Sequence, residues 1–161
     1  MNKLITKPES EHLIRFQDCD PFNHLNNARY LDYFINARED HLASYYHFNL
    51  YQYVKQTGKG WVTVQNQIAY FSPATIMEKV IIQSSLLRMG EKDILVEMHM
   101  WNLEKTILKS LFWATFVYFN LKTNRSEAHP QELIDQFKPL VTPLESEISF
   151  EQRIQQLRVK A

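Results

Sequence analysis

Apolar and polar residues alternate from Trp61 to Phe71, and this pattern predicts the first strand of a sheet. Three further long segments rich in apolar residues follow, and short polar turns separate them. A period of two is typical of strands, because successive side chains point to opposite faces. Turns this short join antiparallel neighbours. The four predicted strands are residues 61–71, 78–88, 93–103 and 107–121.

A different period, between three and four residues, runs from Asn27 to Phe48 and predicts one long helix. No Pro or Gly interrupts the segment, and the side chain of Asn26 or Asn27 can cap its first turn. Apolar residues occupy much of the circumference of this helix. We therefore expect it to be buried on most sides.

Shorter elements flank the helix and the sheet. The alternation in His12–Gln17 indicates a short strand, and Asp18–Asn26 is a loop rich in the turn formers Asp, Asn and Pro. Three short helices are predicted at residues 52–59, 129–137 and 150–159.

Length and strand pattern together set the expected organisation. The 161 residues suit one domain, which we place at residues 11–122, with a flexible N-terminus at 1–10 and a C-terminal extension at 123–161. Several strands are apolar on both faces. One face can cover the helix, and a second copy of the chain is the simplest cover for the other. The expected assembly is a homodimer or a dimer-of-dimers tetramer.

Composition narrows the class of function. The chain has 18 basic and 18 acidic residues, so it lacks the one-sided basic field of a nucleic-acid binder. Cys19 is the single cysteine, which fits a reducing compartment. No apolar run is long enough to cross a bilayer or to form a signal-peptide core. We expect a cytoplasmic protein that binds neither nucleic acid nor membranes.

Three residues with chemical potential occur together: Asp20, His24 and Asn27. A loop that leads into a helix presents free backbone N–H groups and the positive end of the helix dipole, which bind anions and developing oxyanions. A nearby carboxylate can act as nucleophile or general base toward a bound carbonyl. Without further evidence, turn formation and helix capping would be the preferred explanation of these residues over a catalytic site.

The order of these residues carries more information. Residues 18–31, DCDPFNHLNNARYL, resemble the signature of the hotdog-fold 4-hydroxybenzoyl-CoA thioesterase family. In that family an Asp-x-Asp loop precedes a Gly-His-Val-Asn-Asn-like segment and a long helix. The likeness continues to Arg38 and resumes at residues 68–74, IAYFSPA. It covers about residues 11–121 and implies an α+β hotdog fold, a long central helix wrapped by a curved antiparallel sheet of about five strands.

The resemblance assigns roles to the three loop residues. Asp20, the second acid of the Asp-x-Asp pair, would be the catalytic carboxylate. The backbone N–H of Asn27 would polarise the thioester carbonyl. His24 would hold Asp20, orient water or pack the loop. Asn23 replaces the usual Gly, which its tolerance of positive φ allows. The implied reaction is hydrolysis of an acyl-CoA.

Substrate contacts are expected at two further places. Arg88 and Lys92 lie in a strand-end turn of the kind that contacts CoA phosphates in this family, although an ordinary solvated turn explains them equally well. Tyr70 and Phe71 belong to the second matching segment. We expect Arg38 to form a structural ion pair. Five aromatic residues could narrow the acyl site and favour short or medium chains: Phe22, Tyr30, Phe34, Trp61 and Phe71.

Several alternatives remain open. The substrate could be an acyl carrier protein thioester, or the chain could bind acyl-CoA without turnover, although the intact Asp20 disfavours this. A hotdog hydratase would carry Asp-x-Asn-Pro-x-His, and the Asn-Pro pair is absent. No cofactor is expected, and no metal, because the six histidines form no compact cluster. Surface or helix-end positions are expected for His41 and His47.

Overall fold

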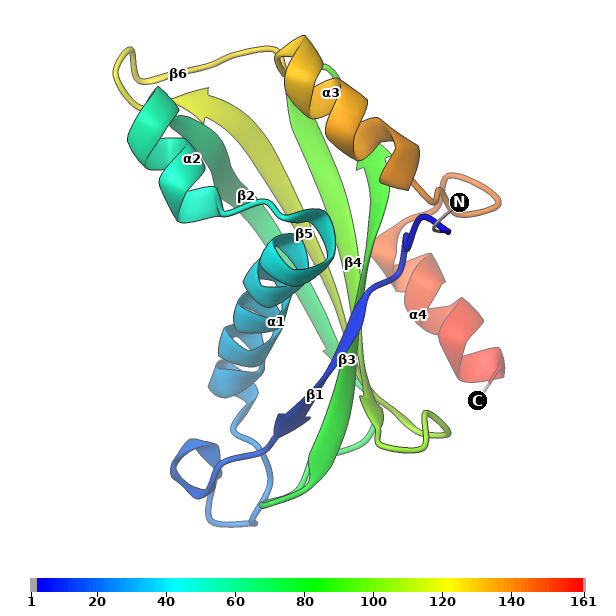
Figure 1. Ribbon diagram of the computed structural model, residues 1–161. Coiled ribbons are helices and arrows are strands. Elements are labelled where there is room, and N and C mark those ends of the chain that lie inside the picture. Colours follow the sequence, from blue (N-terminus) through cyan, green and yellow to red (C-terminus); the bar gives the residue numbers. More distant parts are fainter. Residues whose placement is uncertain (1–2, 161) are drawn as a thin grey trace.

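The computed structural model describes residues 3–160. Its main feature is a curved antiparallel sheet in the order β1-β3-β4-β5-β2, to which β6 adds by pairing with β5 (Figure 1). The strands are β1 (Glu9–Leu13), β2 (Lys59–Tyr70), β3 (Lys79–Met89), β4 (Asp93–Asn102), β5 (Leu108–Asn120) and β6 (Arg125–Ser126). The four strands predicted between residues 61 and 121 are confirmed to within two residues at each end.

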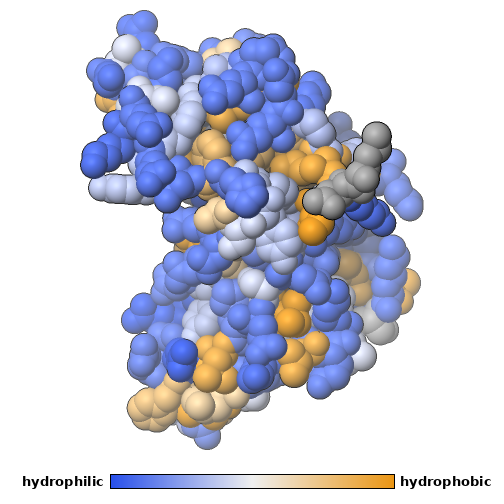
Figure 2. Space-filling model, in the orientation of Figure 1, coloured by the Kyte–Doolittle hydropathy of each residue, from blue (hydrophilic) through white to orange (hydrophobic). Residues whose placement is uncertain are grey.

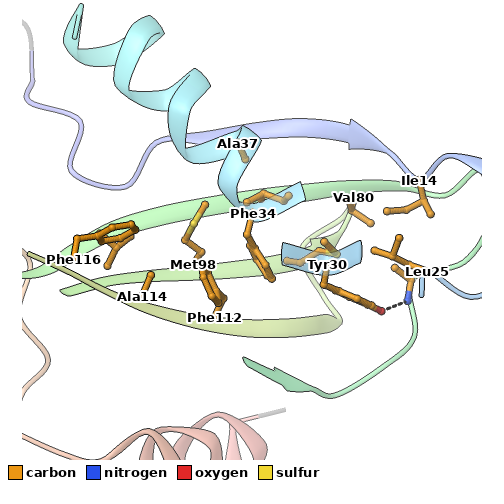
Figure 3. Close-up of a cluster of buried hydrophobic side chains, with 14 of the residues drawn as sticks. Ile14, Leu25, Tyr30, Phe34, Ala37, Val80, Met98, Phe112, Ala114 and Phe116 are labelled. Atoms are coloured by element: carbon orange, nitrogen blue, oxygen red, sulfur yellow. Dashed lines mark hydrogen bonds between the residues drawn. The ribbon is translucent and has the colours of Figure 1, made fainter. Parts of the chain in front are cut away.

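The long helix α1 (Tyr30–Tyr46) lies against the concave face of the sheet. Phe34 points from α1 toward Met98 and Phe112 on the sheet (Figure 3), and its ring stacks on that of Phe112 with centroids 5.2 Å apart. Burial is narrower than we expected. The buried residues of α1 form one stripe at helical spacing: Tyr30, Phe34, Ala37 and His41. The opposite side of the helix is exposed.

The helices outside the core lie at one end of the sheet and against its outer face (Figure 1). The short helix α2 (Leu50–Thr57) ends at Gly58, whose φ of 69° suits a residue without a side chain. The C-terminal helices are α3 (Gln131–Phe137) and α4 (Phe150–Val159). Three single turns of 3₁₀ helix complete the chain: η1 (Phe16–Asp18), η2 (Asn27–Arg29) and η3 (Lys138–Leu140).

The prediction for the first strand is wrong. We expected it at His12–Gln17, but β1 ends at Leu13, and the chain then turns through η1 with Phe16 73% exposed. The strand instead begins earlier, so that Glu9 and Ser10 pair with β3 although we expected them in a flexible segment. Residues 1 and 2 of that segment lie outside the described residues.

Helix α4 of the same chain covers part of the outer face of the sheet. An apolar cluster joins α4 to this face through Leu87, Leu111, Trp113 and Phe150. Arg153 of α4 reinforces the contact with two hydrogen bonds to the buried carboxylate of Glu97, at 2.8 and 2.7 Å. The C-terminal extension therefore supplies part of the core.

No helix within residues 3–160 is long and apolar enough to cross a membrane.

Candidate active site

The loop that carries Asp20 is a closed turn. One carboxylate oxygen of Asp20, Oδ1, accepts hydrogen bonds from the backbone N–H groups of Phe22 (2.9 Å) and His24 (3.2 Å). The Asp20 N–H donates to the His24 carbonyl at 2.8 Å, and Asn23 closes the turn with a φ of 61°. The second carboxylate oxygen, Oδ2, has no hydrogen-bond partner among residues 3–160. The turn thus fixes the side chain and leaves one oxygen free.

The start of the long helix lies directly after this turn. Asn26 caps it, because its side-chain oxygen accepts a hydrogen bond from the Ala28 N–H at 3.0 Å. The helical chain then begins as η2 and continues as α1. The N–H of Asn27 has no acceptor in the part of the chain that the structure describes. A free N–H at this end of a helix is the group that binds a carbonyl oxygen or an oxyanion.

The segment after β2 supports this helix start. The Tyr70 hydroxyl donates a hydrogen bond to the Asn27 carbonyl at 3.0 Å. The Tyr30 hydroxyl accepts one from the Ala74 N–H at 3.1 Å, the dashed line in Figure 3. The rings of Tyr30 and Tyr70 meet edge to face at 5.0 Å. Both stretches that carried the family resemblance therefore meet at one place.

A cleft of about 260 Å³ opens between the two stretches. Five predicted site residues line it: Asp20, His24, Asn27, Tyr70 and Phe71. Leu25, Tyr30, Ser72 and Pro73 complete its wall. The arrangement places a free carboxylate oxygen, a free N–H and an apolar wall around one space, which is what acyl transfer needs.

His24 contributes to the turn through its backbone. Its imidazole makes no hydrogen bond to Asp20 or to any other group in residues 3–160, and its nearest aromatic neighbour is Phe22, with ring centroids 6.4 Å apart. The Cys19 thiol is not activated. Burial and the carboxylates of Asp18 and Asp20 raise its pKa, which lowers the share of reactive thiolate.

Arg88 and Lys92 lie at the opposite end of the sheet. Arg88 is nine residues beyond Lys79 on β3, about 30 Å at the rise of a strand. Its guanidinium pairs with Asp93 at 2.7 Å, and the side chain of Lys92 is exposed. Neither residue lines the Asp20 cleft, and their contact with CoA stays a prediction.

The aromatic residues expected at the acyl site separate into groups. Tyr30 and Phe71 line the cleft. Phe34 belongs to the core, Trp61 lies at the far end of the sheet, and Phe22 is 78% exposed. Aromatic narrowing of the cleft therefore rests on fewer residues than the sequence indicated.

One supporting pair escaped the sequence analysis. Lys109 is buried on β5, where its ammonium group lies 2.9 Å from Glu78 and donates a hydrogen bond to the Pro73 carbonyl. Burial would raise the pKa of Glu78, but hydrogen bonds from Lys109 and Thr75 bring it below its ordinary value. This pair fixes the loop that forms one wall of the cleft. The signal was present in the sequence as a lysine inside an otherwise apolar strand.

Two predictions on α1 are wrong. Arg38 forms no ion pair within residues 3–160; its guanidinium lies over the ring of Phe116, 4.2 Å from the centroid. His41, expected at the surface or a helix end, is 2% exposed, and burial lowers its pKa to about 4. His47 does lie at a helix end, as the residue that terminates α1.

Comparison with known proteins assigns the family. The model of the thioesterase-like superfamily matches residues 14–137. The long-chain acyl-CoA thioesterase FadM of Escherichia coli K12 is 30% identical over 129 residues, 80% of this chain and 95% of the relative.

Solved structures agree with this assignment. YbaW, a probable thioesterase from Escherichia coli, superposes with a TM-score of 0.72 at 25% identity over 83% of this chain and 98% of its own. SAV2348 from Staphylococcus aureus, solved in complex with CoA, has a TM-score of 0.76 at 17% identity over 89% of both chains. The chain thus has the hotdog fold and belongs to the thioesterase-like superfamily, as a thioester hydrolase.

Proposed function

We propose that this protein hydrolyses acyl-CoA thioesters in the Asp20 cleft. The observation that carries the proposal is the pairing of two free groups in one space, the Oδ2 atom of Asp20 and the N–H of Asn27. Two relatives support the choice of substrate. FadM is a long-chain acyl-CoA thioesterase, and SAV2348 was solved with CoA bound.

The proposed reaction begins with the thioester carbonyl against the start of α1. Its oxygen accepts a hydrogen bond from the Asn27 N–H, which stabilises the negative charge that develops in the transition state. Asp20 either attacks the carbonyl carbon to form an anhydride or takes a proton from an attacking water. The carbon–sulfur bond breaks, CoA leaves as the thiolate, and water supplies the second oxygen of the free acid.

We assign His24 the orientation of that water. Its imidazole faces the cleft without a hydrogen-bond partner in the described residues, so it is free to bind a water molecule next to Asp20. Its backbone N–H already holds the other oxygen of the same carboxylate.

We further propose that the working unit is a homodimer formed through β2. This strand has 12 residues and, among residues 3–160, pairs on one side only, with β5. Val64 on this strand is 57% exposed. A long unpaired edge is a template for another strand. Antiparallel pairing of two β2 edges would bring the Arg88 and Lys92 end of one copy toward the Asp20 cleft of the other. The outer face is occupied by α4, which favours a dimer over a tetramer.

The test of the activity is release of free thiol from a panel of acyl-CoAs, from acetyl to palmitoyl. Asp20→Asn should lower kcat/KM by about a hundredfold or more, since it removes the group that attacks or accepts the proton. Asp135→Asn, an exposed aspartate on α3, is the matched control and should turn over at the wild-type rate.

The same assay separates the competing functions. Faster release from acyl carrier protein thioesters than from every acyl-CoA would identify the carrier-bound substrate. Binding of acyl-CoA without turnover would identify the protein as a non-catalytic acyl-CoA-binding module. Equal rates for wild type and Asp20→Asn would refute the role of Asp20.

A further inference from the structure

A second cavity lies beside α1, toward the opposite end of the helix from Asp20. It has a volume of about 70 Å³ and is enclosed by α1, β3, β4, α3 and the N-terminal segment. Figure 2 shows apolar side chains gathered at the surface between α3 and α1. Leu42, Leu86 and Phe137 are among the apolar residues of the wall. The cavity shares no lining residue with the Asp20 cleft.

One charged side chain, Arg38, lines this apolar space. Its Nε atom is buried and has no hydrogen-bond partner within residues 3–160, and no carboxylate of those residues lies within ion-pair distance of the guanidinium. Burial lowers the pKa of Arg38 to about 10, so the group still carries its charge at neutral pH. A buried donor without a partner is unfavourable, and an anion would relieve it.

Two polar side chains at the cavity, His41 and Ser84, are already paired. The His41 ring hydrogen-bonds Ser84 at 2.7 Å through Nδ1 and Ser10 at 2.8 Å through Nε2, and Ser10 in turn contacts His12 at 2.7 Å. This chain of hydrogen bonds uses both ring nitrogens of His41. The Nε–H of Arg38, in contrast, is buried without a hydrogen-bond partner among the described residues.

We propose that this cavity binds a short aliphatic carboxylate, such as propionate or butyrate. A carboxylate matches the planar donors of a guanidinium and carries the one charge that Arg38 can neutralise. The short alkyl chain would pack against the apolar wall. A phosphate dianion would keep an uncompensated charge in apolar surroundings, which is strongly unfavourable.

The proposed site is separate from the catalytic one. Arg38 lies 11 residues beyond Asn27, about 16 Å along a helix axis. Phe34 and Phe112, whose rings stack in the core, line neither space. The inference therefore stands independently of the reaction proposed for Asp20.

The test is calorimetric titration of the full-length protein with propionate. Propionamide, which has the same shape without the charge, and sodium chloride at equal ionic strength are the controls. We expect one propionate per chain and no binding of either control. Arg38→Met should weaken propionate binding about tenfold or more, because a charge-assisted hydrogen bond is lost. Asp20→Asn should bind propionate as the wild type does.

A second measurement needs no variant at Arg38, which covers the case that Arg38→Met does not fold. In the wild type, propionate should shift the NMR resonance of the Arg38 Nε–H, and propionamide should not. The proposal is overturned by equal binding of propionate and propionamide, or by an unmoved Nε–H resonance at saturation. Loss of binding in Asp20→Asn with retention in Arg38→Met would also overturn it, since the anion would then occupy the catalytic cleft.

Discussion

The carboxylate of Asp20 has two sides with different environments. One oxygen is held by two backbone N–H groups, and the other faces the cleft. The same side chain therefore explains why the loop keeps its shape and why the carboxylate that we propose as catalytic has a fixed position. At the helix start, Tyr70 fixes the position of Asn27, because its hydroxyl donates a hydrogen bond to the Asn27 carbonyl.

This contact gives a prediction for Tyr70→Phe. Loss of the hydroxyl leaves the ring in place but frees the peptide whose N–H we propose as the oxyanion donor. We expect kcat to fall about five- to tenfold, as one hydrogen bond is worth about 1 kcal/mol, with little change in KM. Steady-state kinetics with the best acyl-CoA of the panel measures both constants.

Tyr51→Phe is the matched control, since Tyr51 is 75% exposed on α2 and makes no side-chain hydrogen bond within the described residues. A rise in KM at constant kcat in Tyr70→Phe would show that Tyr70 serves binding alone and would contradict the positioning role.

Among elements, α4 depends on one buried charge for its place on the sheet. Glu97 is 4% exposed and accepts hydrogen bonds from Arg153, Trp113 and His99. Burial alone would raise its pKa, but the hydrogen bonds from His99 and Arg153 hold the pKa of Glu97 at about 2. A carboxylate with so low a pKa in the folded state makes stability depend on pH.

The direction of this pH dependence follows from the pKa of Glu97 in the unfolded and the folded chain. Glu97 has a pKa near 4.5 when unfolded and about 2 when folded, so the unfolded chain takes up the proton first. Its stabilising contribution is complete above pH 4.5 and is lost as the pH falls toward 2. The shift corresponds to about 3 kcal/mol. Urea unfolding measured from pH 2 to 6 should show that the wild type gains unfolding free energy over Glu97→Gln as the pH rises.

Glu104→Gln, in the exposed β4–β5 turn, should parallel the wild type throughout. If the difference in unfolding free energy between wild type and Glu97→Gln stays constant across this pH range, Glu97 stabilises the fold through packing and not through its charge.

For the whole molecule, the open edge of β2 predicts how copies associate. Val64→Lys places a charge on the 57% exposed position of that edge, and burying it in a dimer is unfavourable. We expect a shift from dimer to monomer in sedimentation velocity, together with lower kcat/KM. Val159→Lys, at an 87% exposed valine on α4, should leave the dimer intact. A wild-type protein that sediments as a monomer would contradict the assembly.

The sequence was most informative where a pattern is local. Long apolar segments between short polar turns located β2 to β5, and the spacing of apolar residues gave α4 its observed bounds. The Asp20 loop was found because each of its residues serves a local turn or cap. The first strand was misplaced because six residues of apparent alternation cannot distinguish Phe16 in solvent from Phe16 in the core.

Partners distant in the chain were beyond reach of the sequence. An amphipathic pattern shows that α4 has an apolar face, but not that Trp113 is the surface it covers. The unpaired state of Arg38 depends on what surrounds it in three dimensions, as does the distance of Arg88 from the cleft. These were the points at which the structure changed the expectation.

The position of α4 ties chain length to the cover of the sheet. A chain ending before residue 149 would keep every strand of the sheet and every residue of the Asp20 cleft, yet Leu111 and Trp113 would face water and Glu97 would lose Arg153. Helix α4 thus occupies apolar surface of the sheet that a shorter chain would expose, and it supplies the buried Glu97 with a cationic partner.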